Sequence, residues 1–262
     1  MRAGVVQFKP DFGDVEGNLE RITSMIAGEE ADLFVLPELA LSGYIFESRD
    51  EAASFAQSSD ATEFDGLAAL AAEKRATIVV GFAESATDGL FNSSLLLAPD
   101  GTRSVYRKVQ LFSKEKSIFD PGNRSPEVVE VDGVRLGMMI CFDWIFPEIA
   151  RTLALKGADI LCHSTNLVLP YCQDAMVTRC IENRVFAVTS NRVGTESRAG
   201  EELTFTGRSQ VLGTKGDILV RAEVDGESIL VAELDHTLAR DKSITPENHV
   251  VTDRRPALYE LG

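Results

Sequence analysis

The segment Leu136–Glu148 (LGMMICFDWIFPE) contains a strand, a turn and the start of a helix. Its first half is an apolar run whose length suits a buried strand. Pro147 suits the first turn of a helix, and Gly157 stands where that helix would end. Cys141 falls between the two elements, so we expect a sharp turn that lifts its side chain off the edge of a sheet.

A thiol in this position allows two interpretations. A nearby cation and backbone N–H groups would lower its pKa from about 8.5 toward neutrality and make it a nucleophile. Alternatively, Cys141 is a small apolar residue that ends a core strand, which is the commoner role of a buried cysteine. The rest of the chain has to decide between them.

Apolar periodicity divides the chain into alternating strands and helices. Helices are expected from about Asp14 and from about Thr62, where Thr62 and Asp65 have capping-box spacing. Two more are expected over 147–156 and 171–184. Strands are expected over 3–8, 33–36, 77–82, 95–97, 104–108, 160–163 and 186–190, on both sides of Asp132-Gly133, and around 215–216 and 225–226. Crossovers mixed with hairpins predict an α/β protein with mixed sheets between helical layers. Because no polar linker interrupts the pattern, residues 1–262 are interpreted as a single domain.

Composition excludes several classes of function. The net charge of −15 argues against nucleic acid or an anionic membrane as a partner. The apolar run at the N-terminus is too short for a signal peptide, and no stretch reaches the roughly 18 residues of a membrane helix. The four cysteines show no C-x-x-C spacing, which favours free thiols in the cytoplasm. With three histidines, no His-Glu-x-x-His and no Gly-x-Ser-x-Gly, neither a metal site nor a serine hydrolase is expected.

Three charged residues stand at strand ends or just after them. Glu38 follows the strand over 33–36, Lys108 ends a hairpin strand, and Glu115 comes seven residues later. Each alone is more often a solvated charge than a functional group. The adjacent pair Cys162-His163 does not form a dyad, because neighbours on a strand point to opposite faces. Arg179 with Glu182 and Arg184, and Glu148 with Arg151, are interpreted as structural ion pairs.

Taken together, these motifs resemble the nitrilase superfamily of carbon–nitrogen hydrolases. The motifs are Pro-Glu-Leu-x-x-x-Gly-Tyr (37–44), Tyr-Arg-Lys-x-x-Leu-Phe (106–112) and Cys-Phe-Asp-x-x-Phe-Pro-Glu (141–148), and the likeness continues to 253–255. The resemblance implies an α-β-β-α sandwich with Glu38, Lys108 and Cys141 as a catalytic triad, and Glu115 as an auxiliary carboxylate. It implies no cofactor and no metal. Family members usually pair through the helices expected at 147–156 and 171–184, so we expect a homodimer or a larger even assembly.

These residue types have physical roles that fit amide chemistry. Cys141 would attack the substrate carbon and form a covalent adduct. Glu38 would take the thiol proton and later activate water. Lys108 and the backbone N–H of Phe142 would stabilise the developing negative charge. Glu115 would hold Lys108 or pass a proton to the departing ammonia.

The substrate is less well defined by the sequence. Many longer nitrilases carry Trp directly after the cysteine and a C-terminal extension. This chain has Phe142 there and Trp144 two residues later, which favours amides over nitriles. An N-carbamoyl amide, or a non-catalytic binding role, is a weaker alternative. Phe142, Trp144, Tyr44 and Asn166 are candidate substrate-binding residues, although core packing explains Trp144 and Tyr44 equally well.

Overall fold

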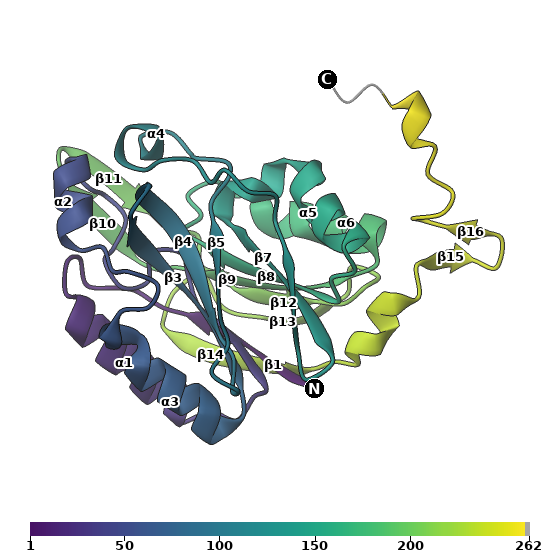
Figure 1. Ribbon diagram of the computed structural model, residues 1–262, viewed down its shortest axis with the longest axis horizontal. Coiled ribbons are helices and arrows are strands. Elements are labelled where there is room, and N and C mark those ends of the chain that lie inside the picture. Colours follow the sequence, from purple (N-terminus) through teal and green to yellow (C-terminus); the bar gives the residue numbers. More distant parts are fainter. Residues whose placement is uncertain (260–262) are drawn as a thin grey trace.

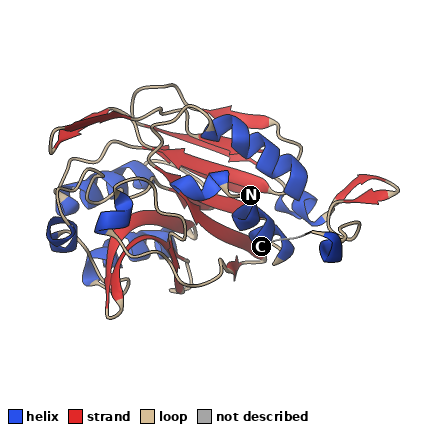
Figure 2. Ribbon diagram, turned by 90° about the horizontal axis from the view of Figure 1, so that it is seen from above, coloured by secondary structure: helices blue, strands red, loops and turns tan. Residues whose placement is uncertain are grey.

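The computed structural model describes residues 1–259, which form two six-stranded sheets between layers of helix (Figures 1 and 2). In spatial order the first sheet contains β14 (Ser228–Glu233), β1 (Arg2–Gln7), β2 (Leu33–Val35), β3 (Thr77–Ala86), β4 (Gly89–Leu97) and β5 (Arg103–Arg107). The second contains β13 (Ile218–Arg221), β12 (Gln210–Leu212), β9 (Phe186–Asn191), β8 (Ile160–Thr165), β7 (Val134–Ile140) and β6 (Val128–Val131). Parallel pairs β1–β2–β3 and β7–β8–β9 form the centres, and antiparallel strands form the edges.

The first sheet has an apolar core on each of its two faces. On β1, Val5 contributes to the core between the sheets, whereas Val6 faces helices α1 (Val15–Ala27) and α3 (Asp65–Lys74). Alternation with period 2 produces this division, because successive side chains of a strand point to opposite faces. Helices α5 (Pro147–Leu155) and α6 (Cys172–Asn183) cover the outer face of the second sheet. The expected α-β-β-α sandwich is confirmed.

Most expected elements are present, with differences at their ends. The turn at Asp132-Gly133 joins β6 to β7, and both residues have positive φ (49° and 78°), as a two-residue hairpin turn requires. The capping box expected at Thr62 is wrong. Residues Thr62–Phe64 form a 3-10 turn, and α3 begins at Asp65 without a side-chain cap.

Several short elements were not expected from the sequence. They are α2 (Arg49–Ser54), α4 (Glu115–Ile118), the hairpin of β10 (Thr195–Arg198) and β11 (Glu201–Thr204), and the hairpin of β15 (Ser243–Thr245) and β16 (Asn248–His249). Figure 1 shows the segment with β15 and β16, in yellow, extending away from the sheets. Within residues 1–259, none of the helices has the length and apolar character needed to cross a membrane.

Candidate active site

Cys141 stands directly after β7, at the sharp turn expected from the sequence. Its φ is +40°, a left-handed conformation that residues other than glycine rarely adopt. Hydrogen bonds on both sides hold this turn: Ile140 donates its N–H to the Asp143 carboxylate at 2.8 Å, and His163 Nε2 donates to the Cys141 carbonyl at 3.0 Å. The thiol therefore has a fixed position at the end of the second sheet.

Glu38 reaches the same place from the first sheet. It follows β2, and Gly81 on β3 allows its backbone to approach closely, since a Cβ at Gly81 would lie 2.6 Å from the Glu38 Cα. The side chain is fully buried, and its Oε1 accepts hydrogen bonds from Asn92 (2.7 Å) and Lys108 (2.6 Å). Its Oε2 has no hydrogen-bond partner among residues 1–259, so one carboxylate oxygen is free to accept a proton.

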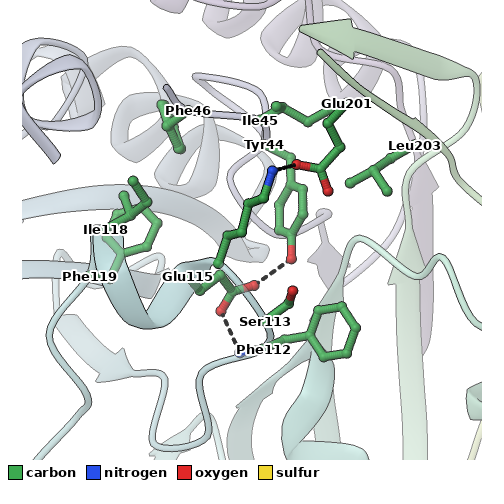
Figure 3. A pocket seen from close by; sticks show the side chains of 11 residues that line it. Tyr44, Ile45, Phe46, Phe112, Ser113, Glu115, Ile118, Phe119, Glu201 and Leu203 are labelled. Carbon is green, nitrogen blue, oxygen red and sulfur yellow. Dashed lines mark hydrogen bonds and ion pairs between the residues drawn. The ribbon is translucent and has the colours of Figure 1, made fainter. Parts of the chain in front are cut away.

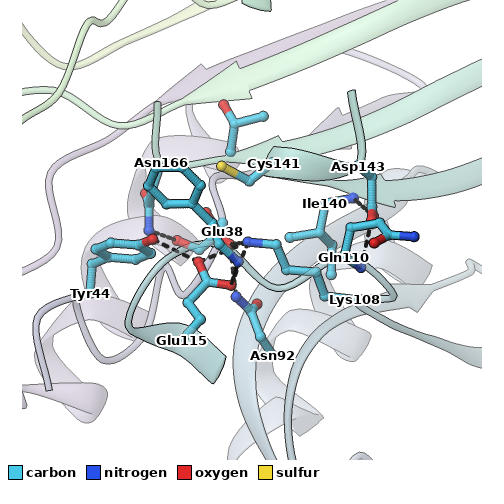
Figure 4. Close-up of polar contacts among 12 residues, drawn as sticks. Glu38, Tyr44, Asn92, Lys108, Gln110, Glu115, Ile140, Cys141, Asp143 and Asn166 are labelled. Atoms are coloured by element: carbon cyan, nitrogen blue, oxygen red, sulfur yellow. Dashed lines mark hydrogen bonds and ion pairs between the residues drawn. The ribbon is translucent and has the colours of Figure 1, made fainter. Parts of the chain in front are cut away.

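Lys108 lies between two carboxylates. Its Nζ is 2.6 Å from Glu38 Oε1 and 2.8 Å from the carboxylate of Glu115, which begins α4. Glu115 is held in turn by the hydroxyl of Tyr44 (2.7 Å) and the N–H of Phe112 (3.2 Å). Figure 4 shows these side chains gathered around Cys141. The four residues that the sequence indicated thus come together between the sheets.

Burial dominates the proton equilibria of this cluster. The pKa of the Cys141 thiol is raised well above its ordinary value by burial and by Glu38, although Lys108 and the backbone N–H of Asn166 act in the opposite direction. The expected lowering of the thiol pKa is therefore wrong, because the loss of water raises the pKa by more than the cation lowers it. Burial also raises the pKa of Glu38, although Lys108 opposes the shift. Burial lowers the pKa of Lys108, but Glu115 and Glu38 outweigh that effect and raise it, so Lys108 stays protonated. The raised pKa favours the protonated thiol of Cys141 over the thiolate.

The candidate substrate-binding residues lie in different surroundings. Phe142 is half-buried, and its ring packs against Phe112 with centroids 5.0 Å apart. Trp144 is 8% exposed and belongs to a buried apolar cluster that includes residues of α5 and α6. The Asn166 side chain donates to the Glu38 carbonyl at 2.8 Å, so it holds the backbone of Glu38 in place.

Sequence reasoning missed two polar residues of this site. Asp143 is fully buried and accepts hydrogen bonds from the Tyr106 hydroxyl (2.8 Å) and the Gln110 N–H (3.1 Å), which ties the turn at Cys141 to the segment carrying Lys108. Burial raises its pKa to about 6. Asn92, on β4, positions Glu38. Asp143 stands within the segment Leu136–Glu148, where a carboxylate between apolar residues could have indicated a buried polar group.

A small cavity of about 60 Å³ adjoins Glu115 (Figure 3). Most of its walls are apolar or aromatic, and they include Tyr44, Ile45, Phe46, Phe112, Ile118, Phe119 and Leu203. Lys114 and Glu201, an ion pair that joins the α4 loop to β11, also line it. Among residues 1–259 no group of His, Cys, Asp and Glu side chains is arranged to hold a metal ion.

The remaining expectations about polar residues are mixed. Cys162 and His163 do not form a dyad with each other: His163 contacts the carbonyl of Cys141 and the Thr189 hydroxyl, and Cys162 is buried in the core. Arg179 and Glu182 form the expected ion pair at 3.0 Å. Arg151 donates to the Glu182 carbonyl at 2.8 Å instead of pairing with Glu148.

Comparison with known proteins defines the family. The model of the carbon-nitrogen hydrolase family matches residues 2–242. This chain belongs to that family. It is 40% identical to a protein of Pyrococcus abyssi named nitrilase, over 99% of both chains. It is 33% identical to an (R)-stereoselective amidase of a Pseudomonas species, over 93% of this chain and 92% of that protein.

A solved structure supports the same assignment. A variant of an amidase from a Nesterenkonia species is 25% identical, covers 92% of this chain and 96% of its own, and superposes with a TM-score of 0.76. That structure shows the result of Michael addition of acrylamide at the active-site cysteine of the amidase. The chain is thus a carbon–nitrogen hydrolase of the nitrilase superfamily with an α/β fold.

Proposed function

We propose that this carbon–nitrogen hydrolase converts small amides into a carboxylic acid and ammonia, with Cys141 as nucleophile. The buried cluster of Glu38, Lys108 and Glu115 around Cys141 is the observation that carries the proposal. It combines an acceptor for the thiol proton, a fixed cation and a second carboxylate, and amide hydrolysis needs all three. The active-site cysteine of the Nesterenkonia amidase supports the role given to Cys141.

The first half-reaction follows from the protonation states. Because the thiol is protonated at rest, Glu38 takes its proton through the free Oε2 as sulfur attacks the amide carbon. The carbonyl oxygen becomes an oxyanion, which Lys108 and the N–H of Phe142 stabilise; one such donor is typically worth about 3 kcal/mol of barrier. The proton held by Glu38 passes to the nitrogen, the carbon–nitrogen bond breaks, and ammonia leaves a thioester on Cys141.

The second half-reaction repeats these roles with water. Glu38 accepts a proton from water, the resulting hydroxide attacks the thioester carbon, and the carbon–sulfur bond breaks. The sulfur recovers the proton from Glu38, and the acid departs. Glu115 keeps Lys108 in position throughout, through contacts of 2.8 Å and through its own bonds to Tyr44 and Phe112.

The cavity beside Glu115 supports a short acyl group as substrate. Its volume of about 60 Å³ is far below the roughly 300 Å³ or more of typical sites for drug-sized ligands. Its mostly apolar walls would bind a short hydrocarbon chain, and the two charges Lys114 and Glu201 that also line it already pair with each other.

A nitrile is the second candidate substrate, and the 40% identical relative named nitrilase favours it. Thiolate attack on a nitrile gives a thioimidate, which must gain water and lose ammonia before it becomes the same thioester. The cluster is compatible with both paths, and Phe142 directly after the cysteine favours the amide.

The test compares matched substrates. We expect kcat/KM for a four-carbon amide to exceed kcat/KM for the four-carbon nitrile. For a dinitrile and the monoamide derived from it, we expect kcat/KM to be higher for the monoamide. Ammonia release should be measured with the wild type and with Cys141→Ala as control. Faster turnover of the nitriles would replace the amidase proposal with the nitrilase one.

We further propose a homodimer, or a larger even assembly, formed through α5 and α6. Exposed apolar side chains support it: Leu155 is 40%, Ile181 43% and Tyr171 63% exposed on or beside these helices. Light scattering at micromolar concentration should give an even multiple of the chain mass, and Ile181→Glu should reduce it. A monomeric wild type would contradict the proposal. The four free, buried cysteines are in keeping with a cytoplasmic location.

A further inference from the structure

The carboxylate of Glu196, on β10, is buried, and both of its oxygens have polar partners, although it lies outside the cluster around Cys141. Its side chain is 6% exposed. Oε1 accepts the backbone N–H groups of Tyr44 (3.2 Å) and Ile45, and Oε2 lies 2.6 Å from Arg192 Nη2. A single side chain thus fixes a loop that is 152 residues away in the sequence.

That loop carries Tyr44, the residue that holds Glu115. The Tyr44 hydroxyl donates to Glu115 Oε1 at 2.7 Å (Figure 3). Burial, Glu115 and Glu38 raise the pKa of Tyr44 well above 10, so the phenol keeps its proton and remains a donor. Glu115 then contacts Lys108 at 2.8 Å.

The surroundings of Tyr44 leave it little freedom. Its ring meets Phe205 edge to face, with centroids 6.0 Å apart, and the Arg192 guanidinium covers the same Phe205 ring at 4.2 Å. Gly43 permits the close approach, since its φ is +85° and a Cβ there would lie 3.1 Å from a Glu196 oxygen. Glu196 therefore contacts the backbone of Tyr44 directly and acts on its ring indirectly, through Arg192 and then Phe205.

We propose that Glu196 is a positioning residue for the hydrolysis, which acts by holding the Tyr44 hydroxyl against Glu115 and so holding Lys108 in place. The inference rests on the proposed function of the Cys141 cluster. It assigns to the β10–β11 hairpin a role in the reaction in addition to the wall that it forms beside the cavity.

The carboxylate cannot be replaced by an amide at this position without loss. Both oxygens of Glu196 accept hydrogen bonds, whereas glutamine has one acceptor oxygen and one donor group. In Glu196→Gln, the amide NH₂ would face either the N–H groups of Tyr44 and Ile45 or the guanidinium of Arg192, and in both cases two donors would meet without an acceptor. Glu196→Asp keeps the charge for Arg192, but its shorter side chain cannot reach both N–H groups in the same way.

The experiment is a double-mutant cycle with Tyr44→Phe. We expect Tyr44→Phe and Glu196→Gln each to lower kcat by about tenfold, the rate equivalent of one hydrogen bond to a charged group, with KM changed less than about twofold. Because both act through one contact, the double variant should fall less than about twofold below Tyr44→Phe. Glu202→Gln, the same change at an exposed site on the same hairpin, should retain wild-type kcat.

A second readout separates this inference from the proposed function. The rate at which iodoacetamide alkylates Cys141 depends on the cluster and not on the substrate, and it should show the same non-additive pattern. If the wild type hydrolyses no amide, the proposed function fails, while the alkylation cycle still tests the role of Glu196. If Glu196→Gln does not fold, Glu196→Asp should show the same loss in kcat.

Two results would overturn the proposal. Losses that multiply to about a hundredfold in the double variant would mean that Glu196 and Tyr44 act independently. If Glu196→Gln lowers the melting temperature but leaves kcat unchanged, with kcat calculated per reactive Cys141 thiol, then Glu196 has only a structural role.

Discussion

Replacing Lys108 with methionine removes the cation that lies between Glu38 and Glu115 and keeps most of the side-chain volume. Lys108 and Glu38 are both fully buried, and Glu115 is 6% exposed. The change therefore creates little cavity, and its main effect is electrostatic. Two buried carboxylates remain without the cation that lay within 2.8 Å of each.

The expected loss of stability is large and depends on pH. Removing one partner of a buried ion pair costs about 3–5 kcal/mol, because the other charge stays buried without compensation. Without Lys108, the pKa of Glu38 rises further above its unfolded value, because Lys108 no longer opposes the effect of burial. A carboxyl of this kind contributes its stability below the unfolded pKa and loses it as pH rises through the folded pKa. The loss amounts to about 1.4 kcal/mol for each pH unit that separates the folded pKa from the unfolded pKa.

Urea unfolding of wild type and Lys108→Met at pH 5.5, 7 and 8.5 measures this effect. Lys108, whose pKa is raised, stays charged over this range, so its own contribution to the wild type should not change. Groups that titrate in both proteins, such as His163, affect both curves alike, so the quantity to compare is the difference between the two free energies of unfolding. The variant should be less stable than the wild type at every pH, and this difference should widen toward pH 8.5. Adding Glu115→Gln to the variant should restore part of the loss. A difference below about 1 kcal/mol, or one that does not grow with pH, would mean that Lys108 does not compensate the two buried carboxylates.

Three further predictions concern the surroundings of the cluster. Burial lowers the pKa of His163 to about 4, so its ring resonances should not titrate between pH 5.5 and 9 in NMR spectra, and a midpoint near 6.5 would contradict the burial argument. Lys114→Ala breaks the exposed ion pair with Glu201 and should change the free energy of unfolding by less than about 1 kcal/mol. Because Lys114 lines the cavity, the same change should raise kcat/KM for a six-carbon amide relative to a three-carbon amide. An unchanged ratio in ammonia-release assays would argue against a role of Lys114 at the cavity. Asp143→Asn should lower kcat/KM for a short amide by about tenfold, because asparagine cannot accept from all three donors around it; wild-type activity in that assay would contradict it.

The sequence predicted the parts of the site that lie at strand ends. Glu38, Lys108 and Cys141 each follow a recognisable strand, and the motifs around them matched a known family. The sandwich was predicted from the family resemblance, whereas apolar runs and turn residues such as Asp132-Gly133, which are local signals, predicted its strands and helices. Glu115 was named as well, although the single turn of α4 that carries it was not.

What the sequence did not show depends on distant contacts. Glu196 lies on a short hairpin with few apolar residues, so periodicity gave no sign of a strand, and its partners in the 44–45 loop are set only by the folded chain. The direction of the shift in the Cys141 pKa was mispredicted for a related reason. Neighbouring charges can be guessed from motifs, whereas the burial that dominates its pKa follows from packing between the two sheets.

Mass spectrometry of the enzyme, quenched during turnover of a short amide, tests the role of Cys141 as nucleophile most directly. We expect the mass of one acyl group on Cys141, its release by hydroxylamine, and one ammonia for each acyl group formed. Neither Cys141→Ala nor Cys141→Ser, which keeps the side-chain size, should carry this thioester. Steady hydrolysis with no adduct at Cys141, together with wild-type activity of Cys141→Ala, would contradict covalent catalysis by this residue.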